Sequence, residues 1–171
     1  NDLIALRTDI EVMRCVNAFD KPFGHGSIQT IKEITDQLSL THDYYMNYGL
    51  GFFCILDKIS YQFIGQAGLF HVGFDTTQTD IELAYRLHTA YWGKGYATEL
   101  ARALIDWGLN THQLPKIISA AHPGNERSIR VLDKSGMHDD GIIDFRGHAL
   151  RGYSITRNSP SNQEIITHNA I

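Results

Sequence analysis

The segment Tyr91-Trp92-Gly93-Lys94-Gly95-Tyr96-Ala97-Thr98-Glu99 contains a Gly-x-Gly turn between two regular elements. The apolar-rich residues 81–87 before it predict a β-strand, and apolar residues at helical spacing after it predict a helix over 95–109. Glycine tolerates positive φ and has no Cβ that would block a ligand. The start of a helix has unpaired N–H groups and the positive end of the helix dipole. This strand, turn and helix therefore predict an anion site, most often one for phosphate.

Three kinds of phosphate site compete for this turn. A dinucleotide fingerprint needs glycine at the sixth position, where this chain has Thr98, and a P-loop needs lysine after its last glycine, where Gly95 is followed by Tyr96. The third kind is a pyrophosphate site for coenzyme A. A lone Gly-x-Gly is also compatible with an ordinary turn that binds nothing.

A second segment favours one of these interpretations. Residues 116–121 predict a short strand, and a helix with the pattern Asn125-x-x-Ser128-x-x-x-Leu132-x-Lys134-x-Gly136 follows it. Together with the 91–99 stretch, this pattern resembles the GNAT superfamily of N-acetyltransferases, and within it the RimJ/RimL-like branch. The resemblance covers roughly residues 9–157.

The resemblance implies an α/β fold of the α+β type. Its mixed, mostly antiparallel central sheet is flanked by helices and has a splayed cofactor cleft. We expect one GNAT domain over residues 1–158, with a loose tail over 159–171. Members of the branch usually begin with a strand, which in this chain is either short, as a stub over Leu3–Arg7, or missing.

The same resemblance implies acetyl-CoA as co-substrate. The pyrophosphate is expected on the backbone of Gly93, Lys94, Gly95, Tyr96 and Ala97, with a contribution from the Thr98 hydroxyl. The amide-rich pantetheine arm is expected to add beside the strand that ends at Leu87 and His88, with a backbone N–H near Leu87 polarising the thioester. Asn125 either contacts the cofactor or only caps its helix.

Acetyl transfer to an amine also needs a proton acceptor and a proton donor. Glu82 lies where several family members place a carboxylate base, with His88 and His122 as alternatives. Many members protonate the leaving thiolate with a tyrosine on the last helix, where this chain has Leu132. The donor is therefore left open between Ser128, Tyr91 and water.

The acceptor is less well defined than the cofactor, because acceptor choice depends on loops outside the motif. The preferred acceptor is the α-amine of a peptide or protein, as in ribosomal-protein acetylation. A small amine or an antibiotic is the main alternative, and a non-catalytic acyl-CoA-binding module is an alternative of another class. Dimers are common in the family, so the resemblance also allows a homodimer.

Composition excludes several other classes. The chain has 171 residues, of which 43% are hydrophobic and 20% charged, as expected for one globular domain. Its net charge of −4 argues against a nucleic-acid binder. No apolar run is long enough for a membrane span, and no signal peptide is visible. Cys15 and Cys54 are expected to be reduced and buried in a cytoplasmic protein, and no cluster has the spacing of metal ligands.

Periodicity and turn residues predict the remaining elements. A helix is expected from Asp9, and a long helix capped by Ser27 with a buried stripe at Ile28, Ile31, Ile34 and Leu38. The tyrosines at 44, 45 and 48 are interpreted as packing residues, with substrate contact as the alternative. A hairpin is expected over 51–56 and 61–70, a helix over 125–135, and two final strands over 138–144 and 150–156.

Overall fold

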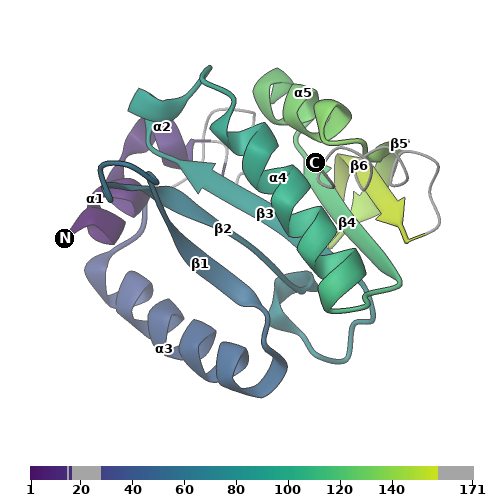
Figure 1. Ribbon diagram of the computed structural model, residues 1–171, viewed down its shortest axis with the longest axis horizontal. Coiled ribbons are helices and arrows are strands. Elements are labelled where there is room, and N and C mark those ends of the chain that lie inside the picture. Colours follow the sequence, from purple (N-terminus) through teal and green to yellow (C-terminus); the bar gives the residue numbers. More distant parts are fainter. Residues whose placement is uncertain (15, 17–27, 158–171) are drawn as a thin grey trace.

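One sheet of six strands organises the molecule (Figure 1). The computed structural model describes residues 1–14, 16 and 28–157. The strands are β1 (Gly51–Leu56), β2 (Phe63–His71), β3 (Ile81–Leu87), β4 (Lys116–Ala121), β5 (His138–Phe145) and β6 (His148–Thr156). Their order is β1-β2-β3-β4-β6-β5, and every neighbouring pair is antiparallel except β3 and β4.

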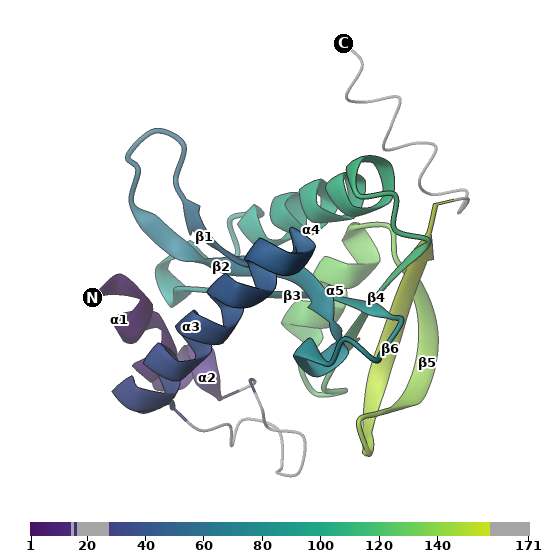
Figure 2. The same cartoon turned by 90° about the horizontal axis from the view of Figure 1, so that it is seen from below.

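The helices cover both faces of this sheet. They are α1 (Asp2–Thr8), α2 (Ile10–Met13), α3 (Ile31–Tyr48), α4 (Tyr96–Asp106) and α5 (Glu126–Lys134). Figure 2 shows α1, α2 and α3 on one side of β1–β3 and α4 on the other. The helix α5 lies beside α4, where Arg102 donates two hydrogen bonds to the carbonyl of Lys134.

The main core lies between β3, β4 and the two later helices. Ile81 and Leu83 project from β3 onto Ala101 and Ile105 of α4, and all four are buried in one cluster with Leu132 of α5. The apolar residues at helical spacing after the Gly-x-Gly turn therefore form the side of α4 that faces the sheet, with Ala101 and Ile105 buried. As a result, the odd-numbered residues of β3 face α4 and α5, and the even-numbered ones face the opposite side.

The prediction of a mixed, mostly antiparallel sheet flanked by helices is confirmed. The strands β3 and β4 have the predicted bounds, and α4 begins one residue after Gly95. The hairpin is also confirmed, and the glycines inside β2 do mark close backbone approach. A Cβ added at Gly68 would lie 1.8 Å from the carbonyl oxygen of Gly51.

Of the two alternatives for the amino terminus, the strand stub over Leu3–Arg7 is wrong. These residues belong to helix α1, in which Leu6 packs into a small buried cluster with Val12 and Met13. Among the described residues, β1 is the first strand. The side chain of Asp9 then caps α2 by accepting hydrogen bonds from two backbone N–H groups.

The long helix exists, but its start and its buried stripe differ from the prediction. It begins at Ile31, where Thr30 and Glu33 form a capping box. Ile31 is 63% exposed and Leu38 44% exposed, whereas Ile34 and Tyr44 are buried. The helix runs on to Tyr48 and ends at Gly49 in the left-handed conformation.

Cys54 is exposed and carries a free thiol, which corrects the prediction of a buried cysteine. It lies on β1, which is the edge strand next to β2 in the described sheet. The predictions for Cys15, for Ser27 as a helix cap and for a loose tail over 159–171 fall outside the described residues.

Candidate active site

The strands β3 and β4 separate after a short paired stretch. Only Ile81 with Ile117 and Glu82 with Ile118 are in register. One residue beyond this pairing, the Ser119 hydroxyl donates to the carbonyl of Leu83 at 2.9 Å. The cleft expected from the family resemblance therefore opens at Glu82.

Among the described residues, the edge of β3 that faces this cleft has no partner strand beyond Glu82. The N–H of His88 donates to the carbonyl of Ile64 at 2.9 Å, so the N–H groups of Tyr85 and Leu87 point the other way, toward β4. The Leu87 carbonyl accepts a 2.8 Å hydrogen bond from the Trp92 indole. An amide-rich arm could pair with the N–H groups of Tyr85 and Leu87 as an added strand. His88 differs from Leu87 in that its N–H is already bonded.

The turn over residues 93–97 has the geometry of an anion site. Gly93 and Gly95 have φ of 74° and 90°, and a Cβ added at either would meet open space. The N–H groups of Thr98 and Glu99 both donate to the Gly95 carbonyl. Within the described chain, the structure gives no protein acceptor for the five N–H groups of residues 93–97. Such a row of donors at a helix start fits a diphosphate.

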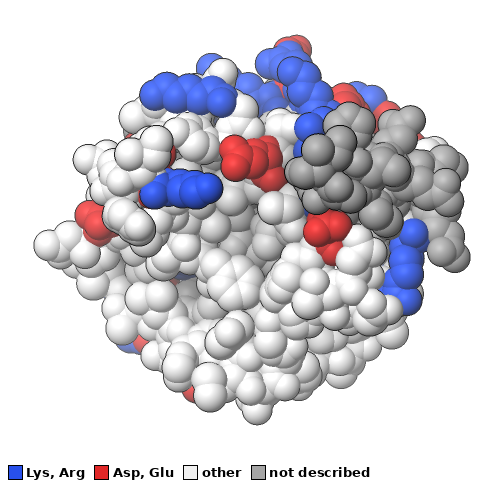
Figure 3. All heavy atoms as spheres, in the orientation of Figure 1, with Lys and Arg blue, Asp and Glu red and all other residues white. Residues whose placement is uncertain are grey.

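Two basic side chains lie near this turn. In Figure 3 many Lys and Arg side chains lie along the upper edge, where α4 and α5 begin in Figure 1, with some Asp and Glu side chains among them. Lys94 lies 5.6 Å from the Tyr91 ring centroid, and Arg127 of α5 lies 4.8 Å from the Trp92 ring centroid. Both cations are exposed, and neither forms an ion pair with a carboxylate of the described residues, so both can approach a phosphate.

Glu82 lies at the point where the cleft opens, on the face of β3 opposite α4. Burial raises the pKa of its carboxyl to about 7, while Arg146, the Gly73 N–H and Arg86 act in the lowering direction. A carboxyl with that pKa is partly deprotonated at neutral pH and can accept a proton. The position and the pKa of Glu82 therefore suit a general base.

Ser128 has a hydrogen-bond partner, Tyr85, that was not predicted from the sequence. The Tyr85 hydroxyl lies 2.9 Å from the Ser128 hydroxyl oxygen and donates to the Ser128 carbonyl at 3.3 Å. Burial raises the pKa of Tyr85, so its phenol keeps its proton at neutral pH. The contact could have been predicted from the odd-numbered position of Tyr85 on β3, because side chains at odd positions of this strand point toward α5.

Other candidate residues have structural roles. Asn125 caps α5, its side chain accepting from the Ser128 N–H at 3.3 Å, and Leu132 is fully buried. The Nδ1 atom of His122 accepts a hydrogen bond from the Gly124 N–H. Tyr44 is buried, and its hydroxyl accepts from the His71 N–H at 2.8 Å, which confirms the packing interpretation for that tyrosine.

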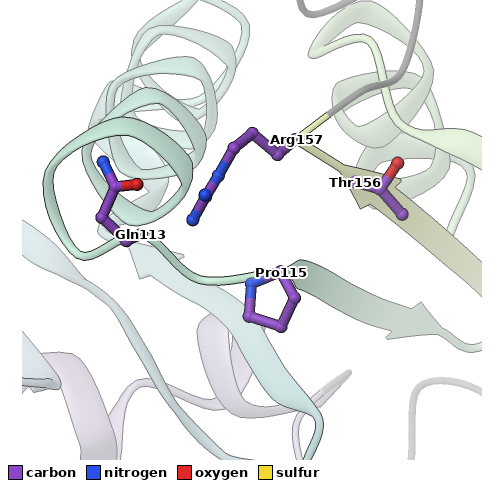
Figure 4. Close-up of a pocket in the computed structure, with 4 residues that line it drawn as sticks. All are labelled: Gln113, Pro115, Thr156 and Arg157. Atoms are coloured by element: carbon purple, nitrogen blue, oxygen red, sulfur yellow. The ribbon is translucent and has the colours of Figure 1, made fainter.

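A hollow of about 320 Å³ lies away from these residues, at the far end of α4 (Figure 4). Gln113, Pro115, Thr156 and Arg157 line it. None of these four residues is a carboxylic acid or a histidine, so the hollow contains no pair of an acid and a base.

Among the residues that the structure describes, no group of three or more His, Cys, Asp or Glu side chains could hold a metal ion. No helix in the described part of the chain is long and apolar enough to cross a membrane.

The chain belongs to the GNAT acetyltransferases, because the family model described as "Acetyltransferase (GNAT) domain" matches residues 1–138. It is similar to the probable N-acetyltransferase YjcK of Bacillus subtilis, with 30% identity over 80% of this chain and 71% of that protein. It is also similar to the uncharacterised protein YkkB of the same organism, with 41% identity over 53% of this chain. That match spans 52% of YkkB, about half of its length.

Solved structures with this fold include acetyltransferases with different acceptors. Aminoglycoside acetyltransferase AAC(6')-Ib, solved with coenzyme A and kanamycin, has a TM-score of 0.73 and 17% identity over 95% of this chain and 91% of its own. The ribosomal-protein-S5-alanine acetyltransferase of Vibrio fischeri has a TM-score of 0.65 and 21% identity over 92% of this chain and 87% of its own. At these identities the likeness shows the fold alone.

Proposed function

We propose that the protein is an acetyl-CoA-dependent N-acetyltransferase of the RimJ/RimL-like type. One observation carries this proposal: among the described residues, the N–H groups of residues 93–97 have no protein acceptor, and they follow directly on β3, whose edge toward β4 is unpaired beyond Glu82. The N–H groups of residues 93–97 suit the diphosphate of coenzyme A, and the edge of β3 suits its pantetheine arm. Bound acetyl-CoA supplies an activated acetyl group as a thioester.

The residues around the cleft supply the remaining functions. The Leu87 N–H faces the cleft and can polarise the thioester oxygen. Glu82 accepts a proton from the amine, directly or through water, as the amine attacks the carbonyl carbon. The carbon–sulfur bond then breaks, and the thiolate takes a proton from the hydroxyl pair of Tyr85 and Ser128, which lie 2.9 Å apart.

The preferred acceptor is the α-amine of a peptide or protein, of the ribosomal-protein type. A base with a pKa of about 7 is better matched to an α-amine, with a pKa of about 8, than to a lysine side chain, with a pKa of about 10.4. The fold shared with a ribosomal-protein acetyltransferase agrees with this choice. The fold shared with an aminoglycoside acetyltransferase supports a small amine or antibiotic as the second candidate.

The deciding experiment is incubation with labelled acetyl-CoA and a panel of peptides, polyamines and aminoglycosides, read by mass spectrometry. We expect an acetyl group on the α-amine of a subset of the peptides. Coenzyme A binding without acetylation of any amine would favour a non-catalytic acyl-CoA-binding module. Preferential labelling of aminoglycosides would favour the antibiotic alternative.

A further inference from the structure

Two arginines, one buried and one half-buried, lie at the face of β3 that carries Glu82. Arg86 projects from β3 four residues after Glu82, so both side chains leave the strand on the same side. Arg7 of α1 is only 2% exposed and reaches the same region through Gln66, the residue paired with Arg86 across β2 and β3. Its Nε donates to Oε1 of Gln66 at 3.0 Å.

Neither guanidinium is neutralised by a carboxylate within the described chain. The remaining hydrogen bonds of Arg7 go to the side-chain amides of Gln29 and Gln37. The guanidinium of Arg86 lies 5.0 Å from the Phe52 ring centroid, and one of its nitrogens lies 3.9 Å from the Met13 sulfur. These neighbours supply no negative charge.

Glu82 offsets the positive charge of Arg86 only in part, because its effect of raising the pKa of Arg86 is smaller than the lowering effect of burial. No ion pair joins it to Arg7 or Arg86 among the described residues. Burial lowers the pKa of Arg86 to about 9, and the nearby charge of Arg7 acts in the same direction. Burying a charge without a partner is unfavourable, because the protein interior solvates the charge less well than water does. The two arginines therefore leave positive charge beside the expected position of the acceptor amine.

We infer that the acceptor carries a carboxylate close to its reacting amine, and that Arg86 binds this carboxylate. This inference rests on the proposed function and names the substrate class of the same site. The planar guanidinium of Arg86 matches a carboxylate with two parallel hydrogen bonds. Arg7 is a positioning residue that adds charge behind it through Gln66. A polycationic acceptor is disfavoured by the same charges.

The test compares acceptors that differ only by one carboxylate. One arm uses a free amino acid against its amide. The other uses C-terminally amidated peptides with Glu or Gln as the second residue. The two arms separate a free amino acid from an acidic peptide as the source of the carboxylate. We expect at least about tenfold higher kcat/KM for the acidic member of one pair.

Arg86→Met should remove this preference, bringing the ratio of the acidic to the amide acceptor close to one. Arg86→Lys keeps the charge and should retain part of the ratio. Arg130→Met removes an exposed arginine of α5 and should leave the ratio of the acidic to the amide acceptor unchanged. Coenzyme A affinity and the melting temperature check that each variant folds.

A second readout needs no turnover. With coenzyme A present, the acidic acceptor should raise the melting temperature of the wild-type protein, and the amide should not. Arg86→Met should abolish this shift. Equal use of acid and amide, or an unchanged ratio in Arg86→Met, would overturn the inference. If no amine is acetylated, a carboxylate-dependent shift still supports the inference while the proposed function fails, and the absence of a shift overturns both.

Discussion

Glu82 combines burial with a position at the point where β3 and β4 separate. Its raised pKa gives the first prediction. The base must be deprotonated to act, so kcat/KM should rise with pH through about 7 and level off above it. Glu82→Gln should lower kcat/KM by about 10²- to 10⁴-fold and remove this pH-dependent rise. Initial rates between pH 5.5 and 9 test both effects.

Coenzyme A affinity should be unchanged in Glu82→Gln, because the carboxyl is expected to contact only the acceptor side. Full activity in this variant would transfer the role of base to another group or to water. Loss of coenzyme A binding together with activity would instead indicate a structural role.

The same carboxyl predicts a pH dependence of stability. The folded pKa of about 7 lies above the reference value of 4.5, so the folded state binds this proton more tightly than the unfolded state. The free energy of unfolding should therefore fall as the pH rises from about 4.5 to about 7. Glu82→Gln should remove this cost and stabilise the protein at pH 8 by on the order of 2 kcal/mol.

Urea denaturation at pH 5 and pH 8 measures this effect. Glu126→Gln, at an exposed carboxylate of α5, is the matched control and should show no such pH-dependent gain. An equal gain at both pH values for Glu82→Gln would contradict the assignment of a raised pKa.

Tyr85 gives the third prediction. Tyr85→Phe removes the hydroxyl that lies 2.9 Å from Ser128 but keeps the aromatic ring in the cleft. We expect kcat to fall about 10²-fold, because the leaving thiolate loses its proton donor. Single-turnover measurements with saturating acetyl-CoA separate this step from binding. A thioester with a more acidic leaving thiol should be affected less, and an equal loss for both thioesters would argue against Tyr85 as the donor.

At the scale of the element, the start of α4 depends on left-handed glycines. Gly95 has φ of 90°, which an L-residue adopts at a cost of about 1–2 kcal/mol. Gly95→Ala should therefore shift the 93–97 turn and weaken coenzyme A binding about tenfold or more, as measured by calorimetry. Gly141→Ala is the matched control, since Gly141 has φ of 76° and equally open surroundings but lies on β5. It should lose comparable stability and keep its coenzyme A affinity.

The elements near the cleft could be predicted because local sequence alone specifies them. The alternation in residues 81–87, the glycines of the turn and the helical stripe after it all indicate the same strand, turn and helix. The amino-terminal elements could not be predicted in this way. Leu3–Arg7 is too short for periodicity to separate a strand from a helix, and burial of Leu6 against α2 decides the outcome.

The long helix shows a second limit of prediction. Its apolar residues at 31 and 38 have helical spacing yet are exposed, because the sheet is contacted through residues such as Ile34 and Tyr44. Spacing identifies the helix, whereas the face that is buried depends on tertiary packing.

At the scale of the whole molecule, the cleft is formed by residues far apart in the sequence. Local patterns identify the turn and Glu82. The pairing of Tyr85 with Ser128 joins β3 to α5, and the pairing of Arg7 with Gln66 joins α1 to β2. No spacing in one sequence shows such contacts. These residues come together around one cleft through the sheet topology, in which the pairing of β3 with β4 ends at Glu82.

The central claim is that the N–H groups of residues 93–97 hold the diphosphate of coenzyme A. Amide chemical shifts in a ¹⁵N-labelled protein test this claim most directly. Titration with coenzyme A should shift the amides of residues 93–97 together with those of Tyr85 and Leu87. Titration with pantetheine, which has no phosphate, should shift only Tyr85 and Leu87. Saturation with coenzyme A that leaves the amides of residues 93–97 unperturbed would contradict the account.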